Sequence, residues 1–471
     1  MTEWRIDDEH PLRELDGLDH ERCAALHNYI VELGWAQRGL ALDTLDKRTW
    51  WECYGGDAAL ANVSDRLNAS VVSFLKAAWH GFSMKPVIKP HLFHRYLARL
   101  CSPEKLWQNV NYAEDEDDSN KRRFVSLYMA NWALGVSHPL GLVLDQDEDT
   151  AMQHMSIHDT DITMNGRQMW LPLEMILDSF VDMIDQGKAL AVGEGYNGEQ
   201  ERTEPWIMPS YTEQNLQDTL QAFEQLVDAI HSRMPSQPQN TERDLLDLVT
   251  GGNPESLPPT SFAHQFLARC PTPAFTHIAP GLGIAQHQPF APASGQLEAD
   301  KLCPLLLFSS TNPAYQETRR APWGEEMRIS PFVRDFDHVS SYPAGLYLTE
   351  SKPYSTHPFE DGSKLVLPFT LGSNAFARTS DSALIGENVG RARDNGAAEI
   401  EPKSTELYQL GFNHFIAAHD VQLRYVLWKW VEMVEEGKWQ VDQDGVVGGI
   451  EKWGEADTEA NWSDYQLPMS W

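Results

Sequence analysis

Two twelve-residue segments far apart in the chain share an apolar and acidic pattern that ends in Gly-Lys. They are LDSFVDMIDQGK at 177–188 and LWKWVEMVEEGK at 427–438. Apolar residues recur at spacings of three and four in both segments, which predicts an amphipathic helix, and Gly followed by Lys is a common helix ending. The recurrence indicates either a duplicated structural element or two ordinary helix ends that are alike by chance.

A row of acids accompanies the first of these predicted helices. Glu174, Asp178 and Asp182 follow one another at steps of four and therefore line up on one side of the helix. Each pair of like charges at this spacing destabilises a helix by on the order of 0.2–0.5 kcal/mol. The row is therefore either a solvated acidic face or the wall of a cleft that holds a cation. The row lies beside an apolar stripe made of Leu173, Leu177, Phe180 and Ile184.

The length and charge of the chain limit its class and its partners. A chain of 471 residues is long enough for two or three lobes, and no run approaches the roughly 18 apolar residues of a membrane span. Lys and Arg number 37 against 69 Asp and Glu, which gives a net charge of −32. Such a charge repels nucleic acid and anionic membranes at long range and attracts cationic ligands, or it simply keeps the protein in solution.

The first residues and the cysteines favour a cytoplasmic protein. The start, MTEWRIDDEHPLREL, is acidic and polar, unlike a signal or transit peptide. The five cysteines are odd in number and contain no CxxC pair, so we expect reduced thiols and neither a disulfide framework nor a zinc site. The chain lacks P-loop, zincin and nucleophile-elbow motifs, and its Gly-x-Gly-x-x-Gly at 193–198 is followed by polar residues where a dinucleotide site needs a helix. No cofactor and no metal site are therefore expected.

The periodicity predicts an α+β protein that is predominantly α-helical, with a minor sheet in the C-terminal half. Residues 1–234 are expected to form a mainly helical lobe and residues 261–471 a mixed α/β lobe. Between them, residues 235–260 are rich in Pro, Gly, Gln, Asn and Ser, which is typical of a linker. We predict helices at 21–45, 63–82, 90–101, 171–188, 212–234, 261–270 and 406–436, and strands at 302–310, 344–351 and 364–371.

The segment WLPLEMILDSFVDMI, which starts at Trp170, resembles the arginine-containing cyclodipeptide synthases of fungi. The hallmark of that family is a D-D-x-x-E motif. The chain has Asp178-Ser179-Phe180-Val181-Asp182 at this position, so the first Asp matches, Ser179 replaces the second, and Asp182 replaces the Glu. The similarity extends over about forty residues, from Trp170 to Tyr211, on the scale of a single motif and not of a whole domain.

The resemblance implies a transferase of fungal specialised metabolism. Such an enzyme takes arginine from arginyl-tRNA and a second amino acid from its own aminoacyl-tRNA, and it closes a diketopiperazine without a cofactor. An ionised carboxylate can hold a guanidinium in a charge-assisted pair, and a less solvated one can accept a proton from an amine. By position, Asp178 is expected to bind the cation, Asp182 to act as base and Glu174 to support them, with exchangeable roles; Trp170 and Arg167 are the candidates for substrate binding.

A tRNA partner opposes the net charge and requires local clusters of basic residues. The alternative for each cluster is an ordinary set of surface charges paired with nearby acids. The second amino acid and the oligomeric state stay open. The candidate clusters are Lys121, Arg122 and Arg123, then Arg319 and Arg320, then Arg391 and Arg393.

Two other classes of function compete with the synthase. The first is an iron- or haem-dependent oxygenase, for which histidines and carboxylates of one segment, or a histidine of a later helix, would be the ligands. The second is a non-catalytic protein that binds a cationic small molecule at the acid row. The candidate ligands of the oxygenase are His154, His158, Asp159 and Asp161 for iron, and His414 or His419 for haem.

Overall fold

The computed structural model divides the chain into two compact units between Pro209 and Ser210. This division precedes the segment 235–260 that the composition predicts as a linker. Within that segment the second unit has a short helix and a 3₁₀ turn, so part of the segment is regular structure. The structure describes residues 2–7, 9–80, 93–108, 123–131, 141–154, 170–198, 205–236, 244–290, 303–320, 326–329, 331–332, 339, 341–349, 359–386, 404–411, 420–468 and 470.

The first unit contains a five-stranded antiparallel sheet and two long helices. The strands follow the order β1-β2-β3-β4-β5, and β6 pairs with β7 in a separate small ladder. The helices are η1 (Thr2–Trp4), α1 (His20–Gln37), η2 (Leu42–Thr44), α2 (Trp50–Cys53), α3 (Gly56–Ala59), α4 (Ala61–Ser64), α5 (Ala69–Ala77) and α6 (Leu173–Asp185). The strands are β1 (Leu97–Leu100), β2 (Phe124–Ala130), β3 (Gly141–Asp145), β4 (Thr150–His154), β5 (Leu171–Pro172), β6 (Leu190–Ala191) and β7 (Trp206–Ile207).

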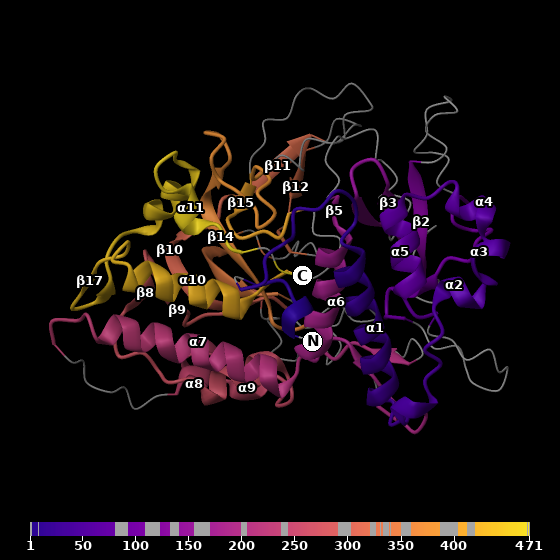
Figure 1. Cartoon of the computed structure of the whole chain (residues 1–471). Helices are drawn as coiled ribbons and strands as arrows, with labels where there is room; N and C mark the ends of the chain where they lie inside the picture. Colours follow the sequence, from indigo (N-terminus) through magenta and orange to yellow (C-terminus); the bar gives the residue numbers. More distant parts are fainter. Residues whose placement is uncertain are drawn as a thin grey trace. The chain divides into compact units, whose positions relative to one another are not determined.

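In the first unit α1 packs against α6 and α5, and a buried hydrogen bond joins α1 to the sheet (Figure 1). The hydroxyl of Tyr128 on β2 lies 2.8 Å from Nδ1 of His27, and the other ring nitrogen lies 2.8 Å from the carbonyl of Trp79. Burial lowers the pKa of His27 to about 4. At neutral pH the ring is therefore neutral and serves as a hydrogen-bonded part of the core.

The second unit is built on a nine-stranded sheet. Its order is β15-β14-β13-β10-β9-β8-β18-β17, with β16 paired to β14; the β8–β18 pair is parallel and the other pairs are antiparallel. The helices are α7 (Glu213–His231), α8 (Leu245–Val249), η7 (Pro254–Ser256), α9 (Phe262–Arg269), α10 (Leu423–Glu435), η9 (Ile450–Asp457) and α11 (Trp462–Tyr465). The strands are β8 (His277–Ala279), β9 (Leu282–Ile284), β10 (Leu305–Pro313), β11 (Glu317–Arg320), β12 (Glu326–Ile329), β13 (Pro343–Leu348), β14 (Gly362–Leu371), β15 (Ser404–Glu406), β16 (Val421–Gln422), β17 (Val441–Asp442) and β18 (Gly445–Val446).

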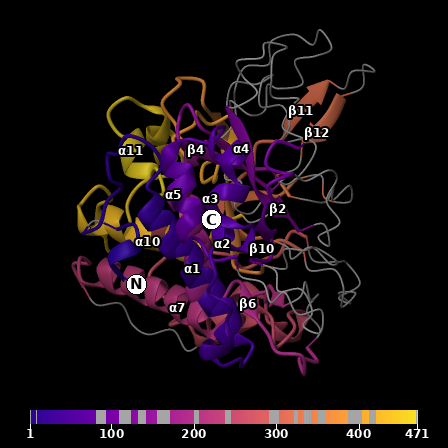
Figure 2. The same ribbon diagram turned by 45° about the vertical axis from the view of Figure 1, so that its right-hand side comes forward.

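The main core of the second unit lies between its sheet and its helices. In Figures 1 and 2, α7 runs alongside α10, and the β11–β12 hairpin stands apart from the large sheet. The core contains three fully buried tryptophans, Trp430, Trp439 and Trp453, which contact one another. The tryptophans near the C-terminus therefore supply core packing, as large aromatic side chains generally do.

The predicted predominance of helix with a minor sheet is wrong. The described residues contain a five-stranded sheet in the first unit and a nine-stranded sheet in the second. Residues 90–101 were expected to be helical, whereas β1 occupies Leu97–Leu100. The strands β2 and β3 are buried at nearly every position, so they lack the alternation of apolar and polar residues that marks a half-exposed strand.

Several predicted elements are confirmed. The helices α6, α7 and α9 lie within the predicted ranges, and Thr212 caps α7 through a reciprocal contact with Asn215. The strands β10, β13 and β14 overlap the three predicted strands. The long helix predicted at 406–436 is wrong, because β15 and β16 precede α10, which begins only at Leu423. Among the described residues, no helix is both long and apolar enough to span a membrane.

The structure favours duplication over chance for the two similar segments. Both α6 and α10 have 13 residues, follow directly on a two-residue strand, and pack on the long helix that begins their unit. Each helix is followed, two residues after its last residue, by a glycine, Gly187 or Gly437, that has a φ of 72°. The eight buried positions of α6 coincide with those of α10 at the constant offset of the two segments: Leu173 with Leu423, Glu174 with Arg424, Ile176 with Val426, Leu177 with Leu427, Phe180 with Trp430, Val181 with Val431, Met183 with Met433 and Ile184 with Val434.

Candidate functional site

Three aspartates form an acidic face on α6. Asp178, Asp182 and Asp185 have side-chain exposures of 15%, 33% and 43%. The spacings of four and seven residues place them on one side of the helix. We call these three residues the acidic face. The opposite side of the helix is apolar and buried, which fixes the direction in which the acids project.

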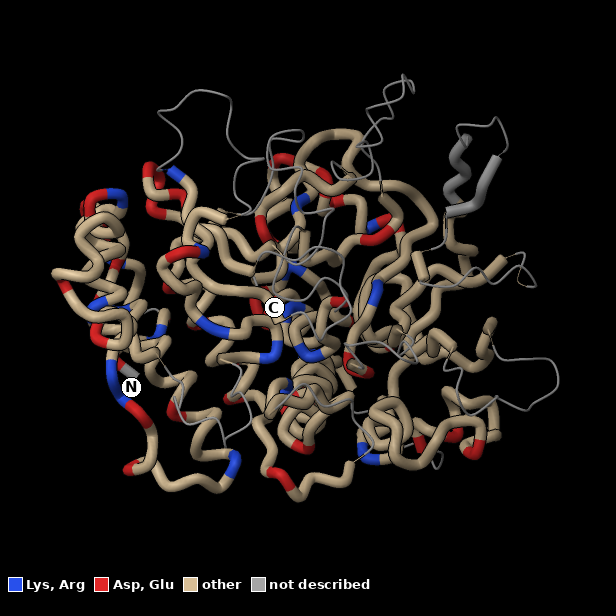
Figure 3. Tube along the Cα trace, turned by 90° about the vertical axis from the view of Figure 1, so that its right-hand side faces the viewer, with Lys and Arg blue, Asp and Glu red and all other residues tan. Residues whose placement is uncertain are grey.

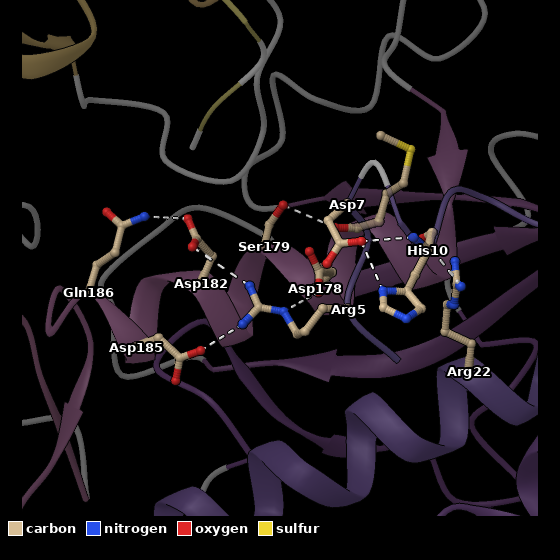
Figure 4. A network of polar contacts seen from close by, with 10 residues as sticks. Arg5, Asp7, His10, Arg22, Asp178, Ser179, Asp182, Asp185 and Gln186 are labelled. Atoms are coloured by element: carbon tan, nitrogen blue, oxygen red, sulfur yellow. Dashed lines mark hydrogen bonds and ion pairs between the residues drawn. The ribbon is translucent and has the colours of Figure 1, made fainter. Parts of the chain in front are cut away.

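One guanidinium contacts all three members of the acidic face. Nε of Arg5 donates to Oδ1 of Asp178 at 2.5 Å, and Nη1 donates to Oδ2 of Asp185 at 2.6 Å. The third nitrogen, Nη2, lies 3.7 Å from Oδ1 of Asp182. Figure 4 shows the guanidinium between the carboxylates, with each nitrogen directed at a different aspartate. The acidic face therefore has the geometry to hold a planar guanidinium.

The charges of this cluster depend on its partial burial. Burial raises the pKa of Asp178 and of Asp185, and the Arg5 guanidinium offsets part of each shift. Burial lowers the pKa of Arg5, but the attraction of the three aspartates outweighs it, so the pKa of Arg5 is raised. Arg5 is therefore charged at any physiological pH, and its charge is what compensates the repulsion within the acidic face.

Glu174, the third acid of the predicted row, lies apart from this contact. It is 5% exposed, and the Cys23 thiol of α1 donates to its Oε2 at 3.6 Å. Burial raises the pKa of Glu174, and burial also raises the pKa of Cys23 well above its usual value. The pair is therefore a buried contact between α1 and α6. The third acid of the site is Asp185, at the other end of α6, and not Glu174 as predicted.

Replacing Glu174 by glutamine should change stability in a pH-dependent manner. The pKa of Glu174 is raised in the folded state, so its ionised form destabilises the fold at a pH above the unfolded value of about 4.3. The stability of Glu174→Gln relative to wild type should therefore rise as pH increases from the unfolded pKa through the raised folded pKa, and then level off. Urea unfolding of both proteins between pH 4 and 8 measures this difference. A flat curve for Glu174→Gln relative to wild type contradicts the prediction.

The residue at the second position of the altered motif does not face Arg5. Oγ of Ser179 donates to the carbonyl of Met175 at 3.0 Å, which is a bond within the helix. Asp182 also accepts a hydrogen bond of 2.5 Å from Gln186. Asp178, which matches the first acid of the motif, and Asp182, which replaces its Glu, are thus brought to one guanidinium.

The predicted substrate-binding residues are only partly described. Trp170 is half-buried just before β5, and its ring lies 5.8 Å from that of Phe124 on β2. This contact packs Trp170 against the sheet of the first unit. Arg167 lies outside the described residues.

The basic clusters predicted to contact tRNA are either paired with acids or only partly described. Arg123 lies 2.6 Å from Asp145 and 3.7 Å from Asp147. The backbone of Arg319 and Arg320 belongs to β11 of the small hairpin, while Lys121, Arg122, Arg391 and Arg393 lie outside the described residues. Figure 3 shows Lys and Arg positions scattered among Asp and Glu positions along the described chain.

The histidines proposed as iron or haem ligands are mostly outside the described residues. His154 ends β4, where it is fully buried and pairs with Gly141 of β3. His158, Asp159, Asp161, His414 and His419 lie in segments that the structure does not describe. Within the described ranges, no group of three His, Cys, Asp or Glu side chains is arranged to hold a metal ion.

Two residues of the site were missed by the sequence reasoning. Asp185 follows Asp178 by seven residues, so helical geometry placed it on the same side, and this signal was available. Arg5 lies 173 residues from Asp178, and no local pattern links them.

Comparisons of the chain with models of protein families, with curated proteins and with solved structures found no match. The similarity of residues 170–211 to the cyclodipeptide synthases therefore stays a prediction.

Proposed function

We propose that the chain binds a ligand that carries a guanidinium group, such as arginine, through the acidic face of α6. One observation supports this proposal above the others: three carboxylates of one helix contact the three nitrogens of a single guanidinium. Charge-assisted hydrogen bonds to a planar guanidinium are strong and directional. The same carboxylates would accept hydrogen bonds from the guanidinium of a free ligand.

The chemistry of the acidic face favours a guanidinium over an ammonium. Asp178 accepts from Nε and Asp185 from Nη1 of the Arg5 head group, while Asp182 faces Nη2. A guanidinium has donors in a fixed planar fork, whereas an ammonium is a compact point charge with strong hydration. The net charge of −32 also raises the local concentration of any cationic ligand near the protein.

The duplicated helix of the second unit supports a functional origin of the acids. At the positions of Asp178, Asp182 and Asp185, α10 has Trp428, Glu432 and Glu435. The two helices share their length, their ends and their buried positions, yet only α6 has three aspartates that contact an arginine. The fold of this helix therefore does not require the acidic face, and a cation lies where it offsets the mutual repulsion of the three acids.

Arginine should stabilise the protein, and the acidic face should be responsible. A ligand at about 100 times its Kd stabilises the folded state by about 2.7 kcal/mol, which raises the melting temperature by several degrees. We expect arginine and agmatine to produce this shift, and we expect citrulline, which has an uncharged ureido group, to produce none. The Asp178→Asn/Asp185→Asn double variant should lose the shift. Differential scanning calorimetry against ligand concentration measures it.

The matched control for this experiment lies on the duplicated helix. Glu432→Gln/Glu435→Gln removes two acids of α10, at the positions that correspond to Asp182 and Asp185, and changes the net charge by the same amount. This control should keep the arginine response of the wild type. Equal loss in both double variants would assign the response to net charge alone, and no response in the wild type would contradict the proposal.

A second candidate is the catalytic activity that the resemblance implies. Asp178 and Asp182, which occupy the first and last acid positions of the motif, both face the same guanidinium, which favours an arginine-containing substrate. In such an enzyme, of fungal specialised metabolism, Asp178 would hold the arginine side chain and Asp182 would accept the proton of the attacking α-amine. Charged tRNA would supply the aminoacyl groups. Glu174 is given no role in this reaction, because it is buried against Cys23.

Expression in a bacterial host tests this second candidate. The host supplies its own charged tRNAs, and mass spectrometry of the medium detects arginine-containing diketopiperazines. A product that disappears in Asp178→Asn and Asp182→Asn variants supports the synthase. If the protein binds arginine but the host makes no such product, the binding function stands and the catalytic one fails.

A further inference from the structure

We infer that the N-terminal segment is an internal competitor for the ligand of the acidic face. The segment consists of residues 2–7 and 9–13, and we call it the strap. Arg5 of the strap uses the same carboxylate oxygens that a guanidinium ligand would use. This inference rests on the proposed function, and it adds a mechanism by which access to the acidic face is controlled.

The strap is attached to the first unit through polar contacts. Arg22 of α1 donates to the carbonyls of Pro11 and His10 at 3.0 and 3.4 Å. Arg13 donates to Asp19, the N-cap of α1, and to Glu21 at 3.2 Å. These contacts hold the C-terminal part of the strap at the start of α1, and Arg5 holds its N-terminal part on α6.

A turn within the strap sets the direction in which it leaves α6. Oδ1 of Asp7 accepts hydrogen bonds from the backbone N–H of Glu9 and of His10 at 3.0 and 2.8 Å, and lies 2.9 Å from Nδ1 of His10. In Figure 4 the contact between Asp7 and His10 lies beside Arg5, and Arg22 lies next to His10. The turn separates two points of attachment, so the Arg5 end can leave α6 while the Arg13 end remains on α1.

No described side chain of the strap is fully buried, although Trp4 and Ile6 are half-buried. Among the described residues from Glu3 to Arg13, every side chain is at least partly exposed, and Leu12 is 39% exposed. Segments with few buried apolar contacts open at a small free-energy cost, far below that of global unfolding. Ion pairs near the surface are also screened by salt. The closed strap is therefore a state that a competing ligand can displace.

The competition lowers the apparent affinity of the protein. When only a fraction of the molecules has an open strap, the apparent Kd equals the intrinsic Kd divided by that fraction. A tethered arginine also has an effective concentration in the millimolar range, because its linker to α1 is short. A free ligand must therefore exceed this local concentration or make additional contacts, and removal of Arg5 should raise its affinity.

Titration calorimetry of arginine into the full chain tests the strap. We expect Arg5→Gln to bind arginine about 10-fold or more tightly than the wild type, the change predicted if the strap is closed in about nine molecules out of ten. Arg5→Lys, which offers a point charge to the acids, should give an intermediate affinity. Arg48→Gln serves as the matched control, because Arg48 is an exposed arginine of the same unit paired with Asp46, and it should bind like the wild type.

Hydrogen exchange of the strap gives a second readout that is independent of affinity. Saturating arginine should accelerate amide exchange in residues 2–7 of the wild type and should leave the exchange of α1 unchanged. Thermal unfolding confirms that each variant is folded. Tighter arginine binding by Arg5→Gln and faster exchange of residues 2–7 together support the strap as an internal competitor.

The outcomes separate the strap from the function on which it rests. If the wild type and Arg5→Gln bind arginine with equal affinity and the strap keeps its protection, the competitor is wrong and the proposed function stands. If neither protein binds arginine, both are wrong.

Discussion

Replacing Asp457 by alanine is expected to lower the free energy of unfolding by about 3–5 kcal/mol, the cost of leaving a buried polar network without its charge. Asp457 ends η9 and is 4% exposed. Its Oδ2 accepts hydrogen bonds from the backbone N–H of Gly372 and Asn374, and its Oδ1 from those of Phe376 and Ala377, all at 3.0 Å. The carboxylate therefore fixes the backbone that follows β14, and alanine would leave four N–H groups without this acceptor.

Two further variants separate this effect from a general loss of charge. Asp457→Asn keeps the volume but presents an NH₂ group to two N–H donors, so we expect an intermediate loss. Asp464→Asn makes the same change at a residue of α11 that pairs with Lys438 at 2.9 Å, where a surface ion pair is worth about 0–1 kcal/mol. Urea unfolding followed by tryptophan fluorescence measures all three. A cost for Asp457→Ala as small as that of Asp464→Asn would contradict the prediction.

Replacing Trp430 by alanine is expected to destabilise the second unit by about 3–5 kcal/mol, because the change leaves a large cavity in the main core. Trp430 lies on α10 and has no exposed surface. Its ring contacts those of Trp439, Trp453 and Phe308, and its Nε1 donates to the hydroxyl of Tyr408 at 3.2 Å. Urea unfolding measured by circular dichroism gives the free energy without depending on the removed fluorophore.

The duplicated helix supplies the conservative variant for this position. Phe180 occupies the same place on α6, so Trp430→Phe should keep most of the packing and cost well under half of the alanine change. Trp428→Ala, at a half-buried position of α10, should also cost less than Trp430→Ala. Equal costs at positions 428 and 430 would mean that the buried face of α10 is assigned incorrectly.

The sequence predicted the helices of this protein better than its sheets, for a physical reason. The apolar stripe of α6 has a period that any amphipathic helix shows, and Thr212 is a recognisable cap of α7. By contrast, β3 is buried at all five positions, so its sequence lacks a strand period. A continuous apolar run does not distinguish a buried strand from a buried helix, and the pairing of β3 with β2 and β4 depends on contacts that only the folded chain contains.

The candidate site was predictable in part. Helical spacing alone brought Asp178 and Asp182 to one side of α6, and the same spacing included Asp185. Spacing could not exclude Glu174, because its burial depends on Cys23 of α1. Arg5 was beyond prediction, because an isolated arginine in a polar N-terminal segment carries no local sign of a partner 173 residues away. Long-range ion pairs of this kind are set by tertiary structure.

The most direct measurement is a crystal structure of Arg5→Ala soaked with arginine. We expect the guanidinium of the bound arginine between Asp178, Asp182 and Asp185, with its nitrogens where those of Arg5 lie in the wild type. The arginine concentration of the soak should saturate any binding seen by calorimetry. If the acidic face is then unchanged and holds no arginine, the assignment of α6 as a guanidinium-binding helix is contradicted.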